Sequence, residues 1–435
     1  MPIKKNNTNL NATKLLNELL KEVKEEIGNG ISNGLIEYSI SLGKAGAGPV
    51  KILDEVLFML LHKGEKDAIR KGAGLSEPSI LREIVCKYAN YPKILMEGGC
   101  NNRNELRNRR KNIQCMVTRR CNLRCSYCPV LKNDEVMGKD VLFKTLDLLL
   151  SSSEENLRLD FTGGEPLYSF DVVMSAMQEG VKKADSLSKK LSFYMVTNGT
   201  MLTRDIAIDL KKFPLLLEIS LDGKREEHNR FKKPVNVTLD PYFETCRAIE
   251  ILLEENVPFY VVMVASPQNV CKLSENFDHI ISLGVRSIDV NYAIGSLWSP
   301  GNLSIFFDEV NKIIDKYKFR IKAGEITLGN ITRRSEPSIL NAEWMVDTDG
   351  SLHLMTEWVF QSSFPYDSSS RSWGNVQNLI SFDALYADRF HAYLELLESS
   401  GWRDKEKRKI IQNNIKVGVK VGNFFKEVIS RNKLK

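Results

Sequence analysis

The sequence predicts an α/β protein built around a parallel sheet. From about residue 113 to residue 317, short apolar segments alternate with longer segments whose apolar residues recur at helical spacing. Six such strand–helix units follow one another, and successive units of this kind form parallel sheets with right-handed crossovers. Periodicity alone does not distinguish a partial barrel from a long open sheet. In either architecture, functional residues are expected just after the strands, at their carboxyl ends.

The individual elements of this core can be placed along the chain. The predicted strands are residues 113–118, 157–161, 191–197, 215–221, 259–264 and 287–292. The helices predicted to follow them are residues 139–151, 169–186, 204–212, 240–255, 270–283 and 304–317. We therefore expect the α/β core to span residues 111–322.

Two further regions flank the core. Residues 1–110 are predicted to be mostly helical, with Gly-rich breaks between the helices. The helices expected there lie near residues 15–27, 50–62 and 78–91. Residues 323–435 are predicted to form a small α+β C-terminal extension with a hairpin at 343–354, a Ser-rich loop and a basic helical tail from Phe382. The hairpin turn is expected at Thr348-Asp349-Gly350.

Composition bounds the class of protein. With 43% hydrophobic and 27% charged residues, the chain has the composition of a soluble globular protein. No apolar run approaches the roughly 18 residues of a membrane span, and the first residues lack the apolar core of a secretory signal. We therefore expect a cytoplasmic protein with no membrane partner. The net charge of +6 is modest. The densest basic stretch, residues 101–112, is interpreted as a solvated linker, which disfavours nucleic acid as a partner.

Three of the eight cysteines fall close together, at Cys121, Cys125 and Cys128, directly after the first predicted strand. A disulfide framework belongs to small secreted domains, so this cluster indicates a metal site instead. Three thiolates can each bind one iron of a cubane cluster, which normally takes four ligands, so that one iron stays open. Zinc is the alternative, but it normally requires a fourth Cys or His ligand. The nearest candidate, Cys115, lies on a strand that should be buried.

This CxxxCxxC motif, its place after the first strand and the aromatic Tyr127 before the third cysteine resemble the radical S-adenosylmethionine (SAM) superfamily. Further matches follow the later strands in order. Gly163, Gly164, Glu165 and Pro166 resemble the family's GGEP element. The resemblance implies that its backbone and Glu165 bind the SAM amino group, with glycines that allow a close approach of the main chain.

Three more segments extend the resemblance. Asn198, in a Thr-Asn-Gly segment after the third strand, is expected near the SAM ribose. Ser220 and Asp222, in a Ser-Leu-Asp-Gly segment after the fourth strand, are expected at the cofactor, although Asp222 is equally compatible with capping the next turn. Arg230 is expected to reach the SAM carboxylate, with Lys232 as the rival candidate. Residues 284–295 resemble the sixth strand and the loop that closes over adenine.

The resemblance covers residues 113–320, about half of the chain. It implies a partial (β/α)6 barrel of the TIM type, with one [4Fe–4S] cluster held by the three cysteines and SAM on its open iron. The implied activity is reductive cleavage of SAM to methionine and a 5′-deoxyadenosyl radical, with an electron from a donor such as flavodoxin or ferredoxin. The protein would position the substrate and exclude water and oxygen.

The Ser-Leu-Asp-Gly segment with His228 most resembles the branch of the superfamily that modifies peptides and proteins. The C-terminal SPASM or twitch domain of that branch opens with a hairpin similar to residues 346–355, and Gly374-Asn375-Val376 resembles a later element. No cysteine follows Cys271. We therefore expect a SPASM-like extension that holds no auxiliary cluster, although the hairpin is also compatible with a plain β-turn. Without that cluster, the electron must return elsewhere, or the reaction must need no net oxidation, as in epimerisation.

The resulting hypothesis is a radical SAM maturase that cross-links, epimerises or oxidises a peptide or protein. The N-terminal region is expected to recognise a leader peptide or to cover the barrel, with recognition favoured. The alternatives are an enzyme acting on RNA or on a small cofactor precursor, and a non-catalytic paralogue that serves as a binding partner. No catalytic acid or base is identified. Candidates to line the pocket, or simply to lie in the core, are Tyr292, Trp298, Trp344, His353, Glu357 and Trp358.

Overall fold

The computed structural model describes residues 14, 16–21, 112–332, 339, 341–358, 372–385, 392, 395–396 and 405–434. Residues 16–21 are helical, as predicted for that segment. The other helices predicted within residues 1–110, and nearly all of the basic stretch at 101–112, lie outside the described residues. Among the described helices, none is both long enough and apolar enough to cross a membrane.

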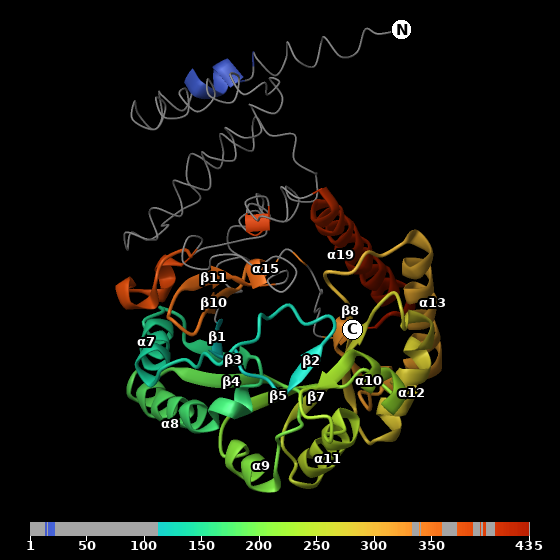
Figure 1. The fold of residues 1–435 in the computed structure, drawn as a ribbon, viewed down its shortest axis with the longest axis horizontal. Coiled ribbons are helices and arrows are strands. Elements are labelled where there is room, and N and C mark those ends of the chain that lie inside the picture. The colour runs from blue at the N-terminus through green and yellow to red at the C-terminus, as the bar shows by residue number, and fades with distance from the viewer. Residues whose placement is uncertain are drawn as a thin grey trace.

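The described residues form a parallel sheet that curves into a partial barrel (Figure 1). Its six central strands follow the order of the chain, and each pairs in parallel with the next. They are β1 (Asn112–Thr118), β3 (Asn156–Gly163), β4 (Lys190–Thr197), β5 (Leu215–Ser220), β7 (Phe259–Ala265) and β8 (Ser287–Tyr292). This order confirms the predicted fold class and selects the barrel from the two architectures that periodicity left open.

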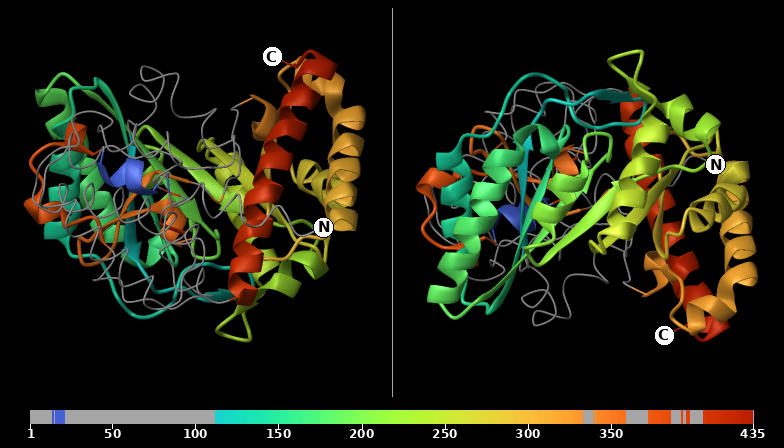
Figure 2. Two further views of the ribbon diagram at one scale, coloured as in Figure 1. Left: turned by 90° about the horizontal axis from the view of Figure 1, so that it is seen from above. Right: turned by 90° about the horizontal axis from the view of Figure 1, so that it is seen from below.

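Helices cover the convex side of this sheet in both perpendicular views (Figure 2). They are α7 (Lys139–Leu150), α8 (Phe170–Ser186), α9 (Arg204–Leu210), α11 (Pro241–Glu254), α12 (Leu273–Ser282) and α13 (Pro300–Lys322). Three of them begin at a capped position. Thr203 accepts a hydrogen bond from the Ile206 N–H in α9, Asp240 accepts one from the Phe243 N–H in α11, and Ser299 accepts one from the Asn302 N–H in α13. The Ser299 cap and Pro300 start α13 four residues earlier than predicted.

The two faces of the sheet differ in burial. In β4, Leu191 and Phe193 are buried and lie next to Gly180 of α8, so they face the helices. The alternating residues Ser192 and Tyr194 project to the concave side and keep partial exposure. The same alternation occurs in β5. The apolar core therefore lies between sheet and helices, while the concave face is polar and accessible, unlike the packed interior of a complete barrel.

The predicted C-terminal hairpin joins the barrel sheet rather than forming a separate layer. Its strands β10 (Trp344–Val346) and β11 (Leu352–Leu354) are antiparallel, as predicted. In addition, β10 pairs in parallel with β1, so that Cys115 is opposite Val346. This pairing was not predicted from the sequence, because the residues of a three-residue strand do not indicate with which strand it pairs. The hairpin therefore extends the edge of the sheet that carries the cysteine segment.

The C-terminal tail packs on the opposite side of the barrel. Helix α19 (Lys405–Asn432) lies beside α13 in both views of Figure 2, where Phe307 and Phe424 stack at 4.4 Å. Asn414 holds the loop after β8 by accepting a hydrogen bond from the Gly295 N–H at 2.8 Å. The tail therefore fixes the loop that was expected to close over adenine.

Candidate functional site

The three clustered cysteines lie on one loop at the carboxyl end of β1. Part of this loop forms a short strand, β2 (Leu123–Cys125), which pairs antiparallel with β6 (Lys232–Pro234). The Ser126 N–H also donates to the Phe231 carbonyl at 2.9 Å. This ladder was not predicted from the sequence. It binds the cysteine loop to the segment that follows the fourth strand of the barrel.

The thiols of Cys121, Cys125 and Cys128 are partly exposed and lie within electrostatic reach of one another. Burial raises the pKa of Cys121, and it raises the pKa of Cys125 to about 12 although the nearby ammonium of Lys232 opposes the shift. Among the described residues, no three His, Cys, Asp or Glu side chains converge on a single metal ion. A cubane cluster needs a different arrangement, because each thiolate binds a different iron. Three neighbouring thiols without a fourth ligand fit such a cluster and fit zinc poorly.

The loop after β3 approaches the cysteine loop very closely. Gly163 has a φ of 149°, and an added Cβ at Gly164 would lie 2.0 Å from the carbonyl oxygen of Arg120. The Gly164 N–H donates to the Thr118 carbonyl at 2.7 Å, and the Glu165 N–H donates to the Arg120 carbonyl at 2.8 Å. The two glycines were expected to let the main chain approach SAM. What the structure establishes is that they let it approach the backbone that leads to Cys121.

Glu165 is completely buried and connects two of the predicted motifs. Its carboxylate accepts hydrogen bonds from the Thr197 hydroxyl at 2.6 Å, from the Asn198 N–H at 2.8 Å and from the Leu167 N–H at 3.2 Å. Burial raises the pKa of this carboxyl, while the three donors oppose the rise. Pro166 is also buried and starts the short 3-10 helix η1 (Pro166–Ser169). Direct binding of SAM by Glu165 and Pro166 stays a prediction, because the contacts of both residues lie within the protein.

Asn198 lies against the cysteine loop. Its amide nitrogen is 3.1 Å from Asn122 Oδ1 and 3.9 Å from Cys121 Sγ, and its amide oxygen accepts from the Thr200 hydroxyl and N–H. The Asn122 amide also donates to the Thr200 hydroxyl at 2.7 Å. The predicted contact of Asn198 with ribose is not tested by these contacts, but they place this residue directly beside one thiol of the candidate site.

Asp222 is the centre of a buried polar cluster. Its carboxylate accepts hydrogen bonds from the Tyr127 hydroxyl and from the Val264 N–H. The ammonium of Lys232 is 3.9 Å from the Asp222 carboxylate and 5.6 Å from the centre of the Tyr127 ring. The expectation that Asp222 caps the following turn is wrong, because its carboxylate instead holds the backbone of β7. Tyr127 and Asp222 thereby connect the cysteine loop to the barrel; contact of either with SAM stays a prediction.

The structure places the two rival cations differently. Lys232 is 3% exposed and reaches both Cys125 and Asp222. Arg230 is exposed, and its guanidinium lies 5.3 Å from the centre of the Phe231 ring. Of these two residues, Lys232 is therefore the one that lies near Cys125, while a SAM-carboxylate role for Arg230 stays a prediction. Ser220 ends β5 and is partly exposed on the concave face, so its expected contact with SAM is sterically open.

His228 has a structural position behind this cluster, in the short helix α10 (Arg225–Phe231). The Asp222 N–H donates to Nδ1 of His228 at 3.3 Å, and the ring is fully buried. Burial lowers the pKa of this imidazole well below its usual value, so it is neutral. The histidine that marked the peptide-modifying branch therefore holds the main chain of the Ser-Leu-Asp-Gly segment.

A polar network lies on the concave face of the sheet. The hydroxyls of Tyr194 and Tyr260 are 2.7 Å apart, and both donate to the Glu218 carboxylate. Arg158 lies 5.0 Å from the centre of the Tyr194 ring and pairs with Asp160 at 2.6 Å. Burial raises the pKa of Glu218, and it raises that of Asp160 to about 6 despite the Arg158 partner. This network was not predicted from the sequence, because single polar residues in apolar strands are also typical of edge positions.

The residues proposed as pocket candidates are mostly core residues. Tyr292, Trp298 and Trp344 are at most 2% exposed and belong to the apolar core. His353 is fully buried and lies 2.9 Å from the Ser351 hydroxyl. The side chains of Glu357 and Trp358 lie outside the described residues. The concave polar network, rather than these residues, faces the accessible side of the sheet.

Comparison with known proteins defines the class to which this site belongs. Residues 115–280 match the family model of the radical SAM superfamily. Residues 115–280 therefore form a radical SAM domain, and the protein is an enzyme that uses a [4Fe–4S] cluster and SAM.

Related proteins match part of this chain in sequence. An uncharacterized protein of Methanocaldococcus jannaschii, MJ0907, is 28% identical over 47% of this chain and 71% of its own length. The radical SAM cyclopropyl synthase TigE of Paramaledivibacter caminithermalis is 26% identical over 52% of this chain and only 50% of its own length. A cysteine-type anaerobic sulfatase-maturating enzyme of Clostridium perfringens is 27% identical over 63% of this chain and 80% of its own length.

The fold also matches solved structures. Native anSMEcpe with bound AdoMet superposes with a TM-score of 0.57 at 17% identity and covers 74% of this chain and 98% of that one. At this level of identity the match supports the partial barrel and its extension. It carries no residue-level assignment.

The close approach of the two loops gives a direct prediction. Gly164→Ala is expected to lower the free energy of unfolding by about 1–3 kcal/mol, because the new methyl group would overlap the Arg120 carbonyl. The protein should also lose iron after reconstitution. Gly301→Ala is the matched control, since the nearest atom to its Cβ would be 3.8 Å away. Thermal unfolding and iron analysis of both variants test this, and a Gly164→Ala protein that keeps both properties would contradict the described loop contact.

Proposed function

We propose that this protein is a radical SAM maturase that modifies a peptide or protein. The observation that carries the proposal is the convergence of three thiols, the Glu165 loop and Asn198 at the carboxyl ends of the strands, above an accessible polar face. Cys121, Cys125 and Cys128 would hold the [4Fe–4S] cluster, which together with SAM would supply a 5′-deoxyadenosyl radical for hydrogen abstraction from a substrate carbon. The relatives include a cyclopropyl synthase, sulfatase-maturating enzymes and a protein for subtilosin biosynthesis, and they support a peptide substrate.

The chain's own residues have three tasks in this proposal. Glu165 connects the loops after β3 and β4 by hydrogen bonds. The N–H groups of Gly164 and Glu165 also hold the start of the cysteine loop by hydrogen bonds to its carbonyls. Lys232 places a positive charge beside Cys125, which favours the thiolate that iron requires. The concave face presents the partly exposed Tyr194 and Glu218 to a substrate that enters the barrel, and the buried Tyr260 supports Glu218. These groups orient the substrate by hydrogen bonds.

The type of modification is part of the proposal. Within these 435 residues no cysteine follows Cys271, so the C-terminal region offers no thiolates for an auxiliary cluster. A reaction without net oxidation suits such a site. We favour epimerisation, in which one hydrogen atom of a substrate carbon ends in 5′-deoxyadenosine and a new hydrogen, supplied as one electron and one solvent proton, returns to the same carbon. An external donor, such as flavodoxin or ferredoxin, would supply two electrons in each turnover, one for the cleavage of SAM and one for the substrate radical.

The test uses short peptides encoded beside the gene, incubated anaerobically with the reconstituted protein, SAM and a reductant in D₂O. Epimerisation gives a mass increase of one deuterium per modified residue, whereas a cross-link gives the loss of two hydrogens. Cys125→Ala serves as the inactive control. If SAM is cleaved but no peptide changes, while RNA that copurifies in a salt-sensitive manner is modified, the peptide assignment is wrong.

The concave network gives a second prediction. Glu218→Gln is expected to lower the rate of peptide modification by about tenfold or more, because a neutral amide replaces the charged acceptor that the two tyrosine hydroxyls share and the substrate is positioned less well. SAM cleavage in the absence of peptide should be unaffected. Glu250→Gln, on the exposed surface of α11, is the matched control. Equal modification rates for the two variants would exclude the network from substrate positioning.

A further inference from the structure

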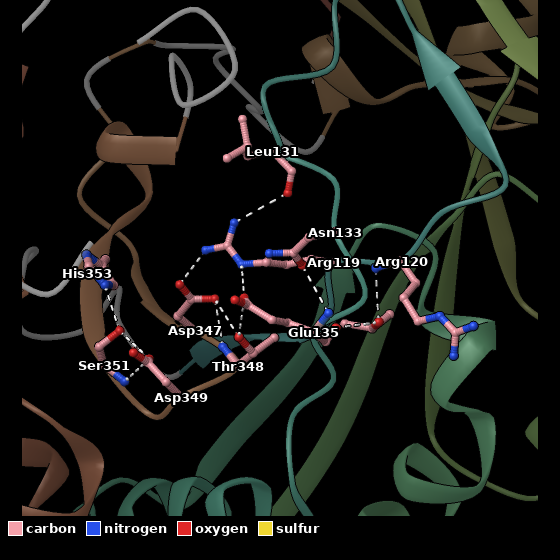
Figure 3. Close-up of polar contacts among 11 residues, drawn as sticks. Arg119, Arg120, Leu131, Asn133, Glu135, Asp347, Thr348, Asp349, Ser351 and His353 are labelled. Carbon is pink, nitrogen blue, oxygen red and sulfur yellow. Dashed lines mark hydrogen bonds and ion pairs between the residues drawn. The ribbon is translucent and has the colours of Figure 1, made fainter. Parts of the chain in front are cut away.

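The C-terminal hairpin touches the cysteine loop at one buried residue, Arg119. Arg119 is 4% exposed and precedes Cys121 by two positions. Its guanidinium lies between the cysteine loop and the hairpin turn (Figure 3). One nitrogen is 2.5 Å from Asp347 Oδ2, and Nε is 3.0 Å from the Glu135 carboxylate. A single side chain therefore joins two segments that are more than two hundred residues apart in the sequence.

Arg119 also closes the cysteine loop on itself. The loop leaves the sheet at Arg119 and returns at Glu135, and all three cysteines lie between these residues. The Arg119 N–H donates to the Glu135 carbonyl at 2.9 Å, and the guanidinium is 3.5 Å from the Leu131 carbonyl. Closing a loop of this length costs conformational entropy, so contacts at its ends strongly affect how well its middle is ordered.

Asp347 is held in place by the hairpin itself. Its side chain is 4% exposed, and the Thr348 N–H donates to Asp347 Oδ1 at 2.7 Å. The Thr348 hydroxyl reaches the Glu135 carboxylate at 3.3 Å. Because β10 pairs with β1 through Val346, the next residue of the hairpin arrives at the edge where β1 passes into the cysteine loop. The pairing of the hairpin with β1 thus places the Asp347 carboxylate beside Arg119, at the start of the cysteine loop.

We propose that the C-terminal hairpin is a structural part of the cluster site, with Asp347 as a positioning residue that acts through Arg119. This inference rests on the proposed cluster at the three cysteines and is independent of the substrate. It assigns a role to a hairpin without cysteines: the hairpin fixes the loop that carries the cluster. Removing either member of this buried pair leaves the other charge without its partner, which is more costly than loss of an exposed ion pair.

The experiment measures how fast a ferrous chelator removes iron from the reconstituted full-length protein. Arg119→Gln and Asp347→Asn are expected to release iron about tenfold faster than the wild type, as is typical when residues that support metal ligands are changed. Arg120→Gln and Asp349→Asn are matched controls. Arg120 pairs with the exposed Asp134 at 3.3 Å, and the Asp349 carboxylate accepts hydrogen bonds from the N–H and hydroxyl of Ser351 while its carbonyl accepts one from Asn375. Both controls should stay within about twofold of the wild type.

A double-mutant cycle separates positioning from general destabilisation. If Asp347 acts through Arg119, Asp347→Asn should add nothing to iron release in an Arg119→Gln background, whereas independent effects would multiply. The EPR spectrum of the reduced cluster is a second readout, and it should broaden in both single variants and not in the controls. If Asp347→Asn fails to fold, Glu135→Gln replaces it, because this variant removes the exposed carboxylate that pairs with Arg119 and leaves the buried partner Asp347 in place. Iron release is then expected to be about threefold faster than in the wild type.

The outcomes distinguish this inference from the proposed function. Wild-type protein that takes up no iron would remove the cluster assignment and the inference together. Wild-type protein that holds its iron, with Arg119→Gln and Asp347→Asn releasing it no faster than the controls, would overturn the inference alone. Multiplying effects in the double variant would also overturn it, because the hairpin would then act by another route.

Discussion

Alanine at Cys121, Cys125 or Cys128 is expected to abolish stable iron–sulfur incorporation. Each thiolate binds a separate iron, so loss of one leaves two ligands for a cluster that already lacks a fourth. Iron and sulfide per chain after anaerobic reconstitution and desalting should fall from about four each to near zero. The absorbance of the cluster in the visible region should disappear in parallel.

Two other cysteines provide the control for this result. Cys246 is half-buried on α11 and Cys271 is exposed, and neither is near the cysteine loop in the chain. Cys246→Ala and Cys271→Ala should therefore keep the full iron content. Equal iron loss in either control and in the three loop variants would mean that the assignment of the ligands is wrong.

Lys232→Met is expected to produce the second large effect. Its side chain is 4% exposed, and it is the cation next to the Asp222 carboxylate, which has no exposed surface. Removing one partner of a buried pair leaves the other charge uncompensated and costs about 3 kcal/mol or more. The free energy of unfolding of the iron-free protein, measured by urea titration, should fall by about this amount. Iron retention should also fall, because β6 carries this lysine beside Cys125.

Lys233→Met is the natural comparison for this variant. Lys233 is the next residue in β6 but projects to solvent. Its loss should change the free energy of unfolding by less than about 0.5 kcal/mol. If the two variants proved equally stable, Lys232 would not be the charge that supports the Asp222 cluster.

Much of the barrel could be predicted from the sequence, because its strands and helices have regular periodicity and clear termini. The predicted segment 287–292 coincides with β8, and Thr197 closes both the predicted and the observed third strand. Motifs at the ends of such strands must converge, since parallel strands bring their carboxyl ends to one edge. The resemblance to the radical SAM superfamily selected Glu165, Asn198 and the cysteines, and this rule predicts that residues at those strand ends lie close together.

The missing elements depend on contacts that leave no local pattern. The β2–β6 ladder consists of two three-residue strands separated by more than one hundred residues. The pairing of β10 with β1 is of the same kind. Likewise, only the fold reveals that Lys232, rather than Arg230, is buried beside Cys125, because the two residues are separated by one position in the sequence. Strand pairing and burial of this type are tertiary effects that override local propensity.

The motif residues also have a structural role that was not predicted from the sequence. Glu165, Asp222 and His228 are all buried, and the described contacts of each hold backbone within the site. The predicted contacts of Glu165 and Asp222 with SAM remain predictions beside this role. In this protein these side chains build the frame on which the cysteine loop and the concave face are placed.

The most direct test of the central claim is the formation of 5′-deoxyadenosine. The protein would be reconstituted anaerobically with iron and sulfide, reduced with dithionite, and supplied with SAM and the peptides encoded beside the gene. The products would be analysed by liquid chromatography. We expect the wild type to form 5′-deoxyadenosine and methionine in equal amounts, and we expect Cys125→Ala to form neither product. A protein that binds zinc and no iron under these conditions, and forms no 5′-deoxyadenosine, would contradict the account.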